Sequence, residues 1–153
     1  MHELSSDPLA ASPFRSPAPL LLYGYGAYGI SWDPIFSFVN FSLCDRGVVY
    51  AIAHVRGGGE LGRAWYEGGK LLTKMNTFRD FIAVAEHLCM LGWTCPKNIV
   101  AQGGSAGGLL VTVVVNERPD LFCGILASVP FVDAVVTMAD SSIPLVSTGT
   151  VFF

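Results

Sequence analysis

The segment NIVAQGGSAGGLLVTVVV, Asn98–Val115, is the part of the sequence that most strongly indicates a fold. Its apolar residues predict a strand over Asn98–Ala101 and, after a sharp turn, a helix over Ala106–Asn116. The turn contains the pattern G-x-S-x-G, which between a strand and a helix holds a serine on a strained turn above the edge of a parallel sheet. That serine is Ser105, and we take it as the candidate catalytic nucleophile.

The residues around Ser105 suit this role. Gly103 and Gly107 have no side chains to crowd the strained turn. The backbone N–H of Ala106 would stand at a helix N-terminus, where the helix dipole and an unsatisfied donor favour a developing oxyanion. The alternative is structural: the segment is a tight connection and its serine caps the helix. The strand before it, the helix after it and the small flanking residues favour the nucleophile.

Apolar runs alternate with longer amphipathic segments along the rest of the chain. The pattern predicts further strands over Leu20–Tyr23, Val48–Ile52 and Gly124–Val129, and helices over Ile35–Cys44 and from a cap at Asn76 or Thr77 to Gly92. This alternation predicts an α/β fold with a mostly parallel sheet and helices on both faces.

Composition limits the function classes. The 153 residues are 52% hydrophobic and 14% charged, which suits one domain with a large buried core. A net charge of -3 with nine Lys and Arg residues leaves no basic surface for nucleic acid or for an anionic membrane. No secretory signal and no apolar run of about 18 residues is present, so a cytoplasmic protein is expected.

The four cysteines do not suggest a metal or redox site. Cys44, Cys89, Cys95 and Cys123 form no C-x-x-C pair and have no histidine at zinc-ligand spacing. We expect reduced thiols in the core, and no metal or cofactor.

A second glycine run, LLLYGYGAYG over Leu20–Gly29, spells the G-x-G-x-x-G pattern of a dinucleotide-binding turn. In that fold a helix starts within the motif and an acidic residue ends the second strand. Here Pro34 delays any helix, while Asp45 precedes the second strand. The sequence therefore does not favour a nucleotide cofactor.

A nucleophilic serine needs a base and an orienting acid. Of the three histidines, His2 lies in the N-terminal tail and His87 on a helix face. His54 ends a predicted strand and is the one candidate base, although support of the neighbouring loop is the simpler interpretation. Asp133 and Asp140 follow Ser105, and Asp133 is interpreted as a helix N-cap.

Several linked motifs carry a resemblance. The segments LLLYGYGAYG, DRGVVYAIAHVRGGGELGRAWYEGG, NTFRDFIAVAEHL, GGSAGG and NERPDLF resemble the catalytic domain of the prolyl oligopeptidase family of serine peptidases. VPFVDAVVTM followed by SIPL is similar to the oligopeptidase B branch. The resemblance runs from Pro19 to Leu145 and implies an α/β-hydrolase fold, a cytosolic location and short peptide substrates, cleaved after Arg or Lys in that branch. It divides the chain into a Pro- and Ser-rich tail (1–19), a partial catalytic domain (20–145) and a divergent end (146–153).

The resemblance also implies site roles. It implies that Ser105 is the nucleophile and that the Ala106 N–H and the Tyr25 hydroxyl donate hydrogen bonds to the oxyanion. The alternative for Tyr25 is packing at a strand end. Arg56 and Glu60 are expected to hold the loop between them by hydrogen bonds. No cofactor is implied.

The chain lacks some parts of the family pattern. Members carry a β-propeller before this region and the triad Asp and His after it. We therefore expect a fragment with later strands missing and little activity alone. The alternatives are a non-catalytic remnant that binds a partner through an unfinished sheet edge, and an esterase or acyl-peptide hydrolase.

Overall fold

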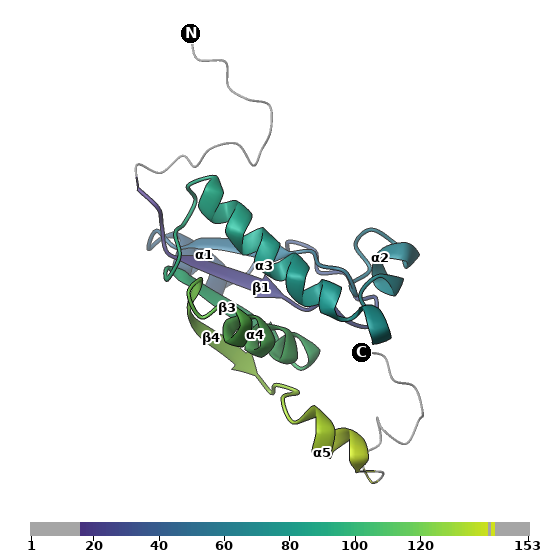
Figure 1. The fold of residues 1–153 in the computed structure, drawn as a ribbon. Helices are drawn as coiled ribbons and strands as arrows, with labels where there is room; N and C mark the ends of the chain where they lie inside the picture. The colour runs from purple at the N-terminus through teal and green to yellow at the C-terminus, as the bar shows by residue number, and fades with distance from the viewer. Residues whose placement is uncertain (1–15, 141, 143–153) are drawn as a thin grey trace.

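A computed structural model describes residues 16–140 and 142 of the chain. A four-stranded parallel sheet forms its centre (Figure 1), with the order β2-β1-β3-β4. The strands are β1 (Leu20–Gly24), β2 (Val49–Ala53), β3 (Ile99–Gly104) and β4 (Phe122–Ser128). The predicted parallel sheet is confirmed, and all four carboxyl ends lie at one edge.

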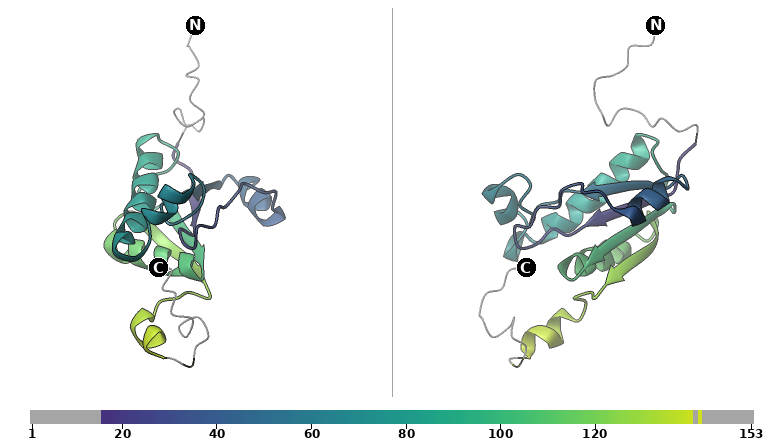
Figure 2. Two further views of the ribbon diagram at one scale, coloured as in Figure 1. Left: turned by 90° about the vertical axis from the view of Figure 1, so that its right-hand side faces the viewer. Right: turned by 180° about the vertical axis from the view of Figure 1, so that it is seen from behind.

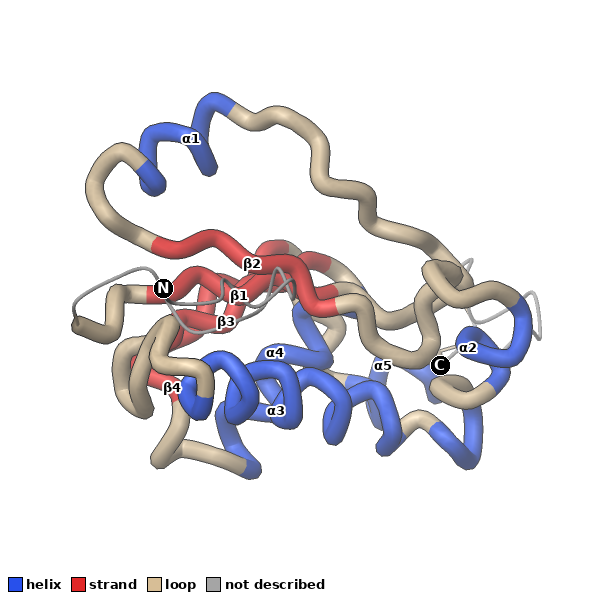
Figure 3. The backbone as a smooth tube through the Cα atoms, turned by 90° about the horizontal axis from the view of Figure 1, so that it is seen from above, coloured by secondary structure: helices blue, strands red, loops and turns tan. Residues whose placement is uncertain are grey.

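Helices cover both faces of the sheet, as predicted. Figures 2 and 3 show α3 (Met75–Met90) and α4 (Ala106–Glu117) together on one face and α1 (Phe38–Cys44) on the other. The short helix α2 (Arg63–Glu67) and the 3₁₀ turn η1 (Leu71–Thr73) connect β2 to α3, and α5 (Ala134–Ala139) follows β4. The first described helix after Gly29 is α1, so the glycine run at Leu20–Gly29 lacks the helix that a dinucleotide turn requires.

The core lies between the sheet and the α3–α4 layer. The Phe81 ring of α3 stacks on Phe122 of β4 with ring centroids 6.1 Å apart. Both side chains are buried, and burial of such a side chain contributes about 1.5–3 kcal/mol. The other large side chains that are almost fully buried are apolar or threonine: Leu20, Leu22, Ile99, Leu110, Leu121, Val55, Val111, Val114, Thr77 and Thr94. The mainly apolar faces of α3 and α4 thus pack on the sheet and hold it in place below the loops at its carboxyl edge.

The first helix differs from its prediction. It begins at Phe38, not Ile35, because the Ser37 side chain caps it by accepting a hydrogen bond from the Asn40 N–H. Three of the apolar side chains in the predicted segment are largely exposed, at 77% for Ile35, 70% for Phe36 and 70% for Val39. Spacing along a helix predicts an apolar face, but does not specify which element will cover it.

Two other boundaries were also predicted wrongly. The N-cap of α3 is Lys74 rather than Asn76 or Thr77. The Asn76 side-chain amide instead donates to the Gly68 carbonyl, at 2.9 Å, and the Thr77 hydroxyl to the Arg56 carbonyl, at 2.7 Å. Strand β4 starts at Phe122, two residues before Gly124, because Phe122 already pairs with Ile99 of β3.

The cysteines also differ from expectation in part. All four are free thiols, but Cys44 and Cys123 are exposed; the other two are half-buried, and Cys89 packs against the core. In the part of the chain that the structure covers, we find no helix with the length and apolar character needed to cross a bilayer.

Candidate active site

Ser105 lies on the sharp turn between β3 and α4. Its backbone is strained, with φ 53° and ψ -115°, a conformation that a residue with a side chain rarely adopts. Hydrogen bonds hold the turn: the Ser105 N–H donates to the Ser128 carbonyl at 3.0 Å, and the Ser105 carbonyl accepts from the Gly108 N–H at 3.0 Å. Ser105 is exposed and occupies the N-cap position of α4, but its side chain makes no capping hydrogen bond within the described residues.

The two glycines around Ser105 permit a close approach. A Cβ atom on Gly103 would collide with the Gly107 carbonyl, and one on Gly107 would lie 2.6 Å from the Gly24 carbonyl oxygen and 3.2 Å from the Tyr25 Cα. Real Cβ atoms do not come this close to backbone. The chain that leaves β1 therefore packs directly on the turn that carries Ser105.

This packing brings Tyr25 beside Ser105, close enough for the serine side chain to act on the pKa of the Tyr25 phenol. Burial raises the pKa of the Tyr25 phenol, while the Ser105 side chain acts in the opposite direction. The phenol is therefore protonated at neutral pH and can donate. Its ring packs against Trp32, with centroids 6.0 Å apart, and against Tyr28, at 6.3 Å.

The second candidate donor is the backbone of Ala106. This residue opens α4, and within the described chain no backbone carbonyl accepts a hydrogen bond from its N–H. The first N–H groups of a helix lack intrahelical partners and lie at the positive end of the dipole. Ser105 thus has two hydrogen-bond donors beside it, a phenol and a backbone amide.

The backbone of Trp32, whose ring contacts Tyr25, is held from two sides. Its N–H donates to Glu60 Oε1 at 3.1 Å, and its carbonyl oxygen lies 2.8 Å from His54 Nε2, which must carry the proton because a carbonyl only accepts. Both residues therefore hold the loop at Trp32, which agrees with loop support by His54, whereas Glu60 was expected to hold the loop between itself and Arg56. The strand order also separates His54 from Ser105 by two strand spacings, about 10 Å.

Arg56 holds the glycine-rich loop to α3. Its guanidinium donates to both carboxylate oxygens of Asp80, from Nε at 2.7 Å and from Nη2 at 2.5 Å, and its backbone N–H donates to Oδ2 at 3.0 Å. The hydrogen bond to Asp80 raises the pKa of Arg56. The loop-holding interpretation of Arg56 is confirmed, but the sequence did not single out Asp80.

The remaining acid and base candidates lie elsewhere. His87 is about 18 Å along α3 from Met75 at its start. Asp133 caps α5 by accepting from the Val136 N–H at 3.2 Å, as interpreted from the sequence, and Asp140 binds Ser142. The described residues contain no hydrogen bond from a histidine or an aspartate to Ser105; His2 lies outside them.

Residues 34–151 match the model of the prolyl oligopeptidase family. Dipeptidyl aminopeptidase BI of Pseudoxanthomonas mexicana is 57% identical over 128 residues, which cover 84% of this chain and 18% of that protein. Protease 2 of Moraxella lacunata is 54% identical over 131 residues, which cover 86% of this chain and 19% of that protein. The chain thus spans about a fifth of the length of these relatives.

Solved structures agree with the fold. Oligopeptidase B from Trypanosoma brucei, with covalently bound antipain, is 57% identical and matches 90% of this chain and 20% of its own with a TM-score of 0.86. Oligopeptidase B from Leishmania major is 58% identical and matches 87% of this chain and 19% of its own with a TM-score of 0.83. The sheet and its helices are therefore part of an α/β-hydrolase fold, and the chain belongs to the prolyl oligopeptidase family.

Proposed function

We propose that the chain carries the nucleophile of a serine-type oligopeptidase that hydrolyses peptide bonds through an acyl-enzyme on Ser105. One observation carries the proposal: an exposed serine on a strained turn lies beside the phenol of Tyr25 and the Ala106 N–H at a helix N-terminus. Such an arrangement of a nucleophile and two donors is suited to acyl transfer.

In the proposed reaction, Ser105 Oγ attacks the scissile carbonyl carbon and gives its proton to a general base. The carbonyl oxygen becomes an oxyanion and accepts hydrogen bonds from the Tyr25 hydroxyl and the Ala106 N–H. The C–N bond then breaks, the amine leaves with the proton, and water hydrolyses the ester on Ser105. Gly103 and Gly107 allow the approach of these groups.

In this proposal neither His54 nor His87 is the general base. We propose that the chain lacks the triad Asp and His and that its 153 residues alone turn over peptides far more slowly than a complete family member. Loss of triad members lowers kcat by several orders of magnitude in serine peptidases.

The substrate class follows from the relatives. Their names, oligopeptidase B and dipeptidyl aminopeptidase, support short peptides as substrates, and the oligopeptidase B likeness supports cleavage after Arg or Lys. The four free thiols fit the reducing cytoplasm, which we propose as the location.

A binding role is the second candidate. Strand β4 is an edge strand of the described sheet, and its Ile125 and Leu126 are 38% and 51% exposed. An edge strand with exposed apolar side chains can pair with another chain. Sedimentation of the purified chain tests this role, because a monomer at all concentrations removes the support for edge pairing.

A chimera tests the peptidase. This chain's residues replace the 128 matched residues of the Pseudoxanthomonas mexicana relative, which supplies the rest of a complete protein. We expect hydrolysis of peptides with Arg or Lys before the cleaved bond, and no turnover by the 153-residue chain itself. A folded chimera that cleaves esters but no peptide supports the esterase alternative; one that cleaves neither contradicts the proposal.

A further inference from the structure

Lys74 is a cation in an unfavourable place. Its Nζ donates to the Gly26 carbonyl oxygen at 2.7 Å and lies 5.9 Å from the centre of the Phe78 ring. No carboxylate of the described residues forms an ion pair with it. Burial lowers its pKa to about 8, and its position at the N-terminus of α3 adds repulsion from the helix dipole.

The acceptor of this hydrogen bond belongs to the loop that carries Tyr25. Gly26 follows Tyr25 directly and has a positive φ of 66°. A Cβ atom on Gly26 would lie 2.7 Å from Val55 Cγ2 and closer still to Thr77 Cγ2. The loop is therefore pressed against the chain just after β2 and against the first turn of α3, and Lys74 binds it at this point of contact.

The first turns of α3 hold other loops around the site in the same way. Thr77 donates to the Arg56 carbonyl, Asp80 accepts from the Arg56 side chain, and Asn76 donates to the Gly68 carbonyl. The hydrogen bonds of Thr77, Asp80 and Asn76 go to Arg56 and Gly68, after β2. The hydrogen bond of Lys74 instead goes to Gly26, after β1.

We propose that Lys74 is a positioning residue: its ammonium holds the Gly26 carbonyl, and with it the loop of Tyr25, at the start of α3. Lys74 acts on Tyr25 through the backbone of Gly26. The consequence for catalysis rests on the proposed function, because it requires the Tyr25 hydroxyl to serve as an oxyanion donor. The effect on the loop does not depend on it.

Amide hydrogen exchange in the 153-residue chain tests the proposal. The reporters are the N–H groups of Gly29 and Ile30, which donate to the Gly57 and Ala27 carbonyls at 3.0 and 3.1 Å. In Lys74→Met we expect both to exchange about tenfold faster, since the loss of one charge-assisted hydrogen bond frees the loop. The amide of Leu88 in α3 reports global opening and corrects for it.

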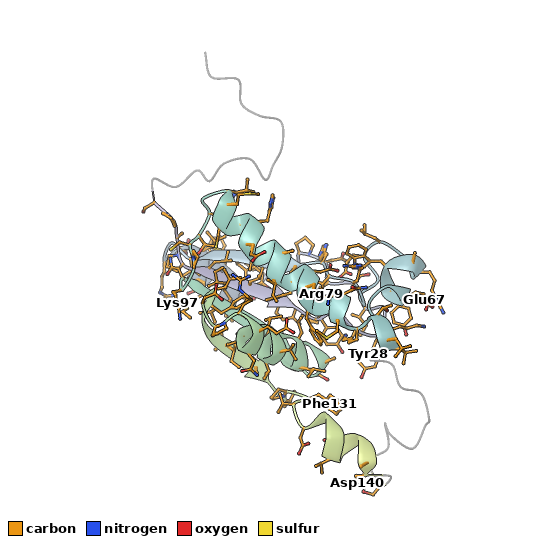
Figure 4. All side chains as sticks on the ribbon, viewed as in Figure 1. Tyr28, Glu67, Arg79, Lys97, Phe131 and Asp140 are labelled. Atoms are coloured by element: carbon orange, nitrogen blue, oxygen red, sulfur yellow. The ribbon has the colours of Figure 1, made fainter. Side chains whose placement is uncertain are left out.

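Lys97→Met is the matched control. Lys97 also donates to a backbone carbonyl, that of Pro119 at 2.8 Å, but Figure 4 shows it at the opposite end of the molecule from Tyr28. Exchange at Gly29 and Ile30 should not change in this variant.

Lys74→Arg keeps a charged donor and should restore slow exchange. Equal exchange in the Met and Arg variants, or rates unchanged in Lys74→Met, overturns the proposal. Where Lys74→Met does not fold, Lys74→Gln takes its place in the comparison. The outcome is independent of whether Ser105 reacts, so an inactive chimera contradicts the proposed function and leaves this test intact.

Discussion

Gly107, in the first turn of α4, lies so close to Gly24 at the end of β1 that an added Cβ atom would be 2.6 Å from the Gly24 carbonyl oxygen. This approach joins the strand that precedes Tyr25 to the helix that follows Ser105. The geometry of the candidate site therefore depends on the absence of one side chain.

Gly107→Ala should lower the free energy of unfolding by about 1–3 kcal/mol, because the methyl group must displace backbone. Urea denaturation measures the change. Gly124→Ala in β4 is the control: nothing lies within 4 Å of its added Cβ, so a change below about 0.5 kcal/mol is expected. Equal effects of the two substitutions would contradict the close packing.

Tyr25→Phe should lower kcat of the chimera about 100- to 1000-fold, because one donor to the oxyanion is removed. Its unfolding free energy should change little, since the ring is kept. Tyr50→Phe is the control, because Tyr50 is also a partly buried tyrosine whose pKa is raised by burial, and it has no predicted role in the reaction. If both variants retain parental kcat, Tyr25 is not an oxyanion donor.

Asp80→Ala should cost about 1.5–3 kcal/mol of stability, because it leaves the half-buried guanidinium of Arg56 without its partner. Glu67→Ala breaks the exposed pairs with Arg63 and Lys70 and should cost much less stability, because solvent screens exposed ion pairs. Thermal unfolding compares the two. A larger loss in Glu67→Ala would contradict the assigned role of the Arg56–Asp80 pair.

The pKa of Lys74 predicts a pH dependence of stability. Burial places this pKa at about 8 in the folded state, against 10.5 for an unperturbed lysine. Between these values the unfolded chain binds the proton more fully than the folded chain, so the free energy of unfolding should rise with pH. Below about pH 8 both states are protonated and the cost of burying the charge is fully present.

The comparison of the parent with Lys74→Met isolates this contribution. Urea denaturation at several pH values from 7.5 to about 10 should show stability rising more steeply in the parent. Above about pH 10 the tyrosines oppose the trend, since burial raises the pKa of Tyr23 to about 12. Parallel curves from pH 8 to 10 would show that Lys74 is not buried as a cation.

The parts of the site that the sequence predicts are local in the chain. The pattern around Ser105 specifies a strand, a strained turn and a helix within about ten residues, and the structure has all three. Asp80 and Lys74 escaped prediction because their partners are 24 and 48 residues away, with no spacing that marks the pair. Only the fold brings them together.

The prediction for α1 failed for a different reason. Helical spacing places apolar side chains on one face, but the element that would bury that face is not among the described residues. The capping residue Ser37 was a better guide to the start of the helix than the apolar periodicity from Ile35 onward.

In the proposed reaction Ser105 forms the covalent acyl-enzyme, and labelling of the active serine tests this step directly. The chimera is treated with a fluorophosphonate or a slowly hydrolysed ester, digested, and the adduct mapped by mass spectrometry. We expect an adduct on the peptide that contains Ser105, none in Ser105→Ala, and unchanged labelling in His54→Ala and His87→Ala. An adduct on another residue, or equal labelling of Ser105→Ala, would contradict this step.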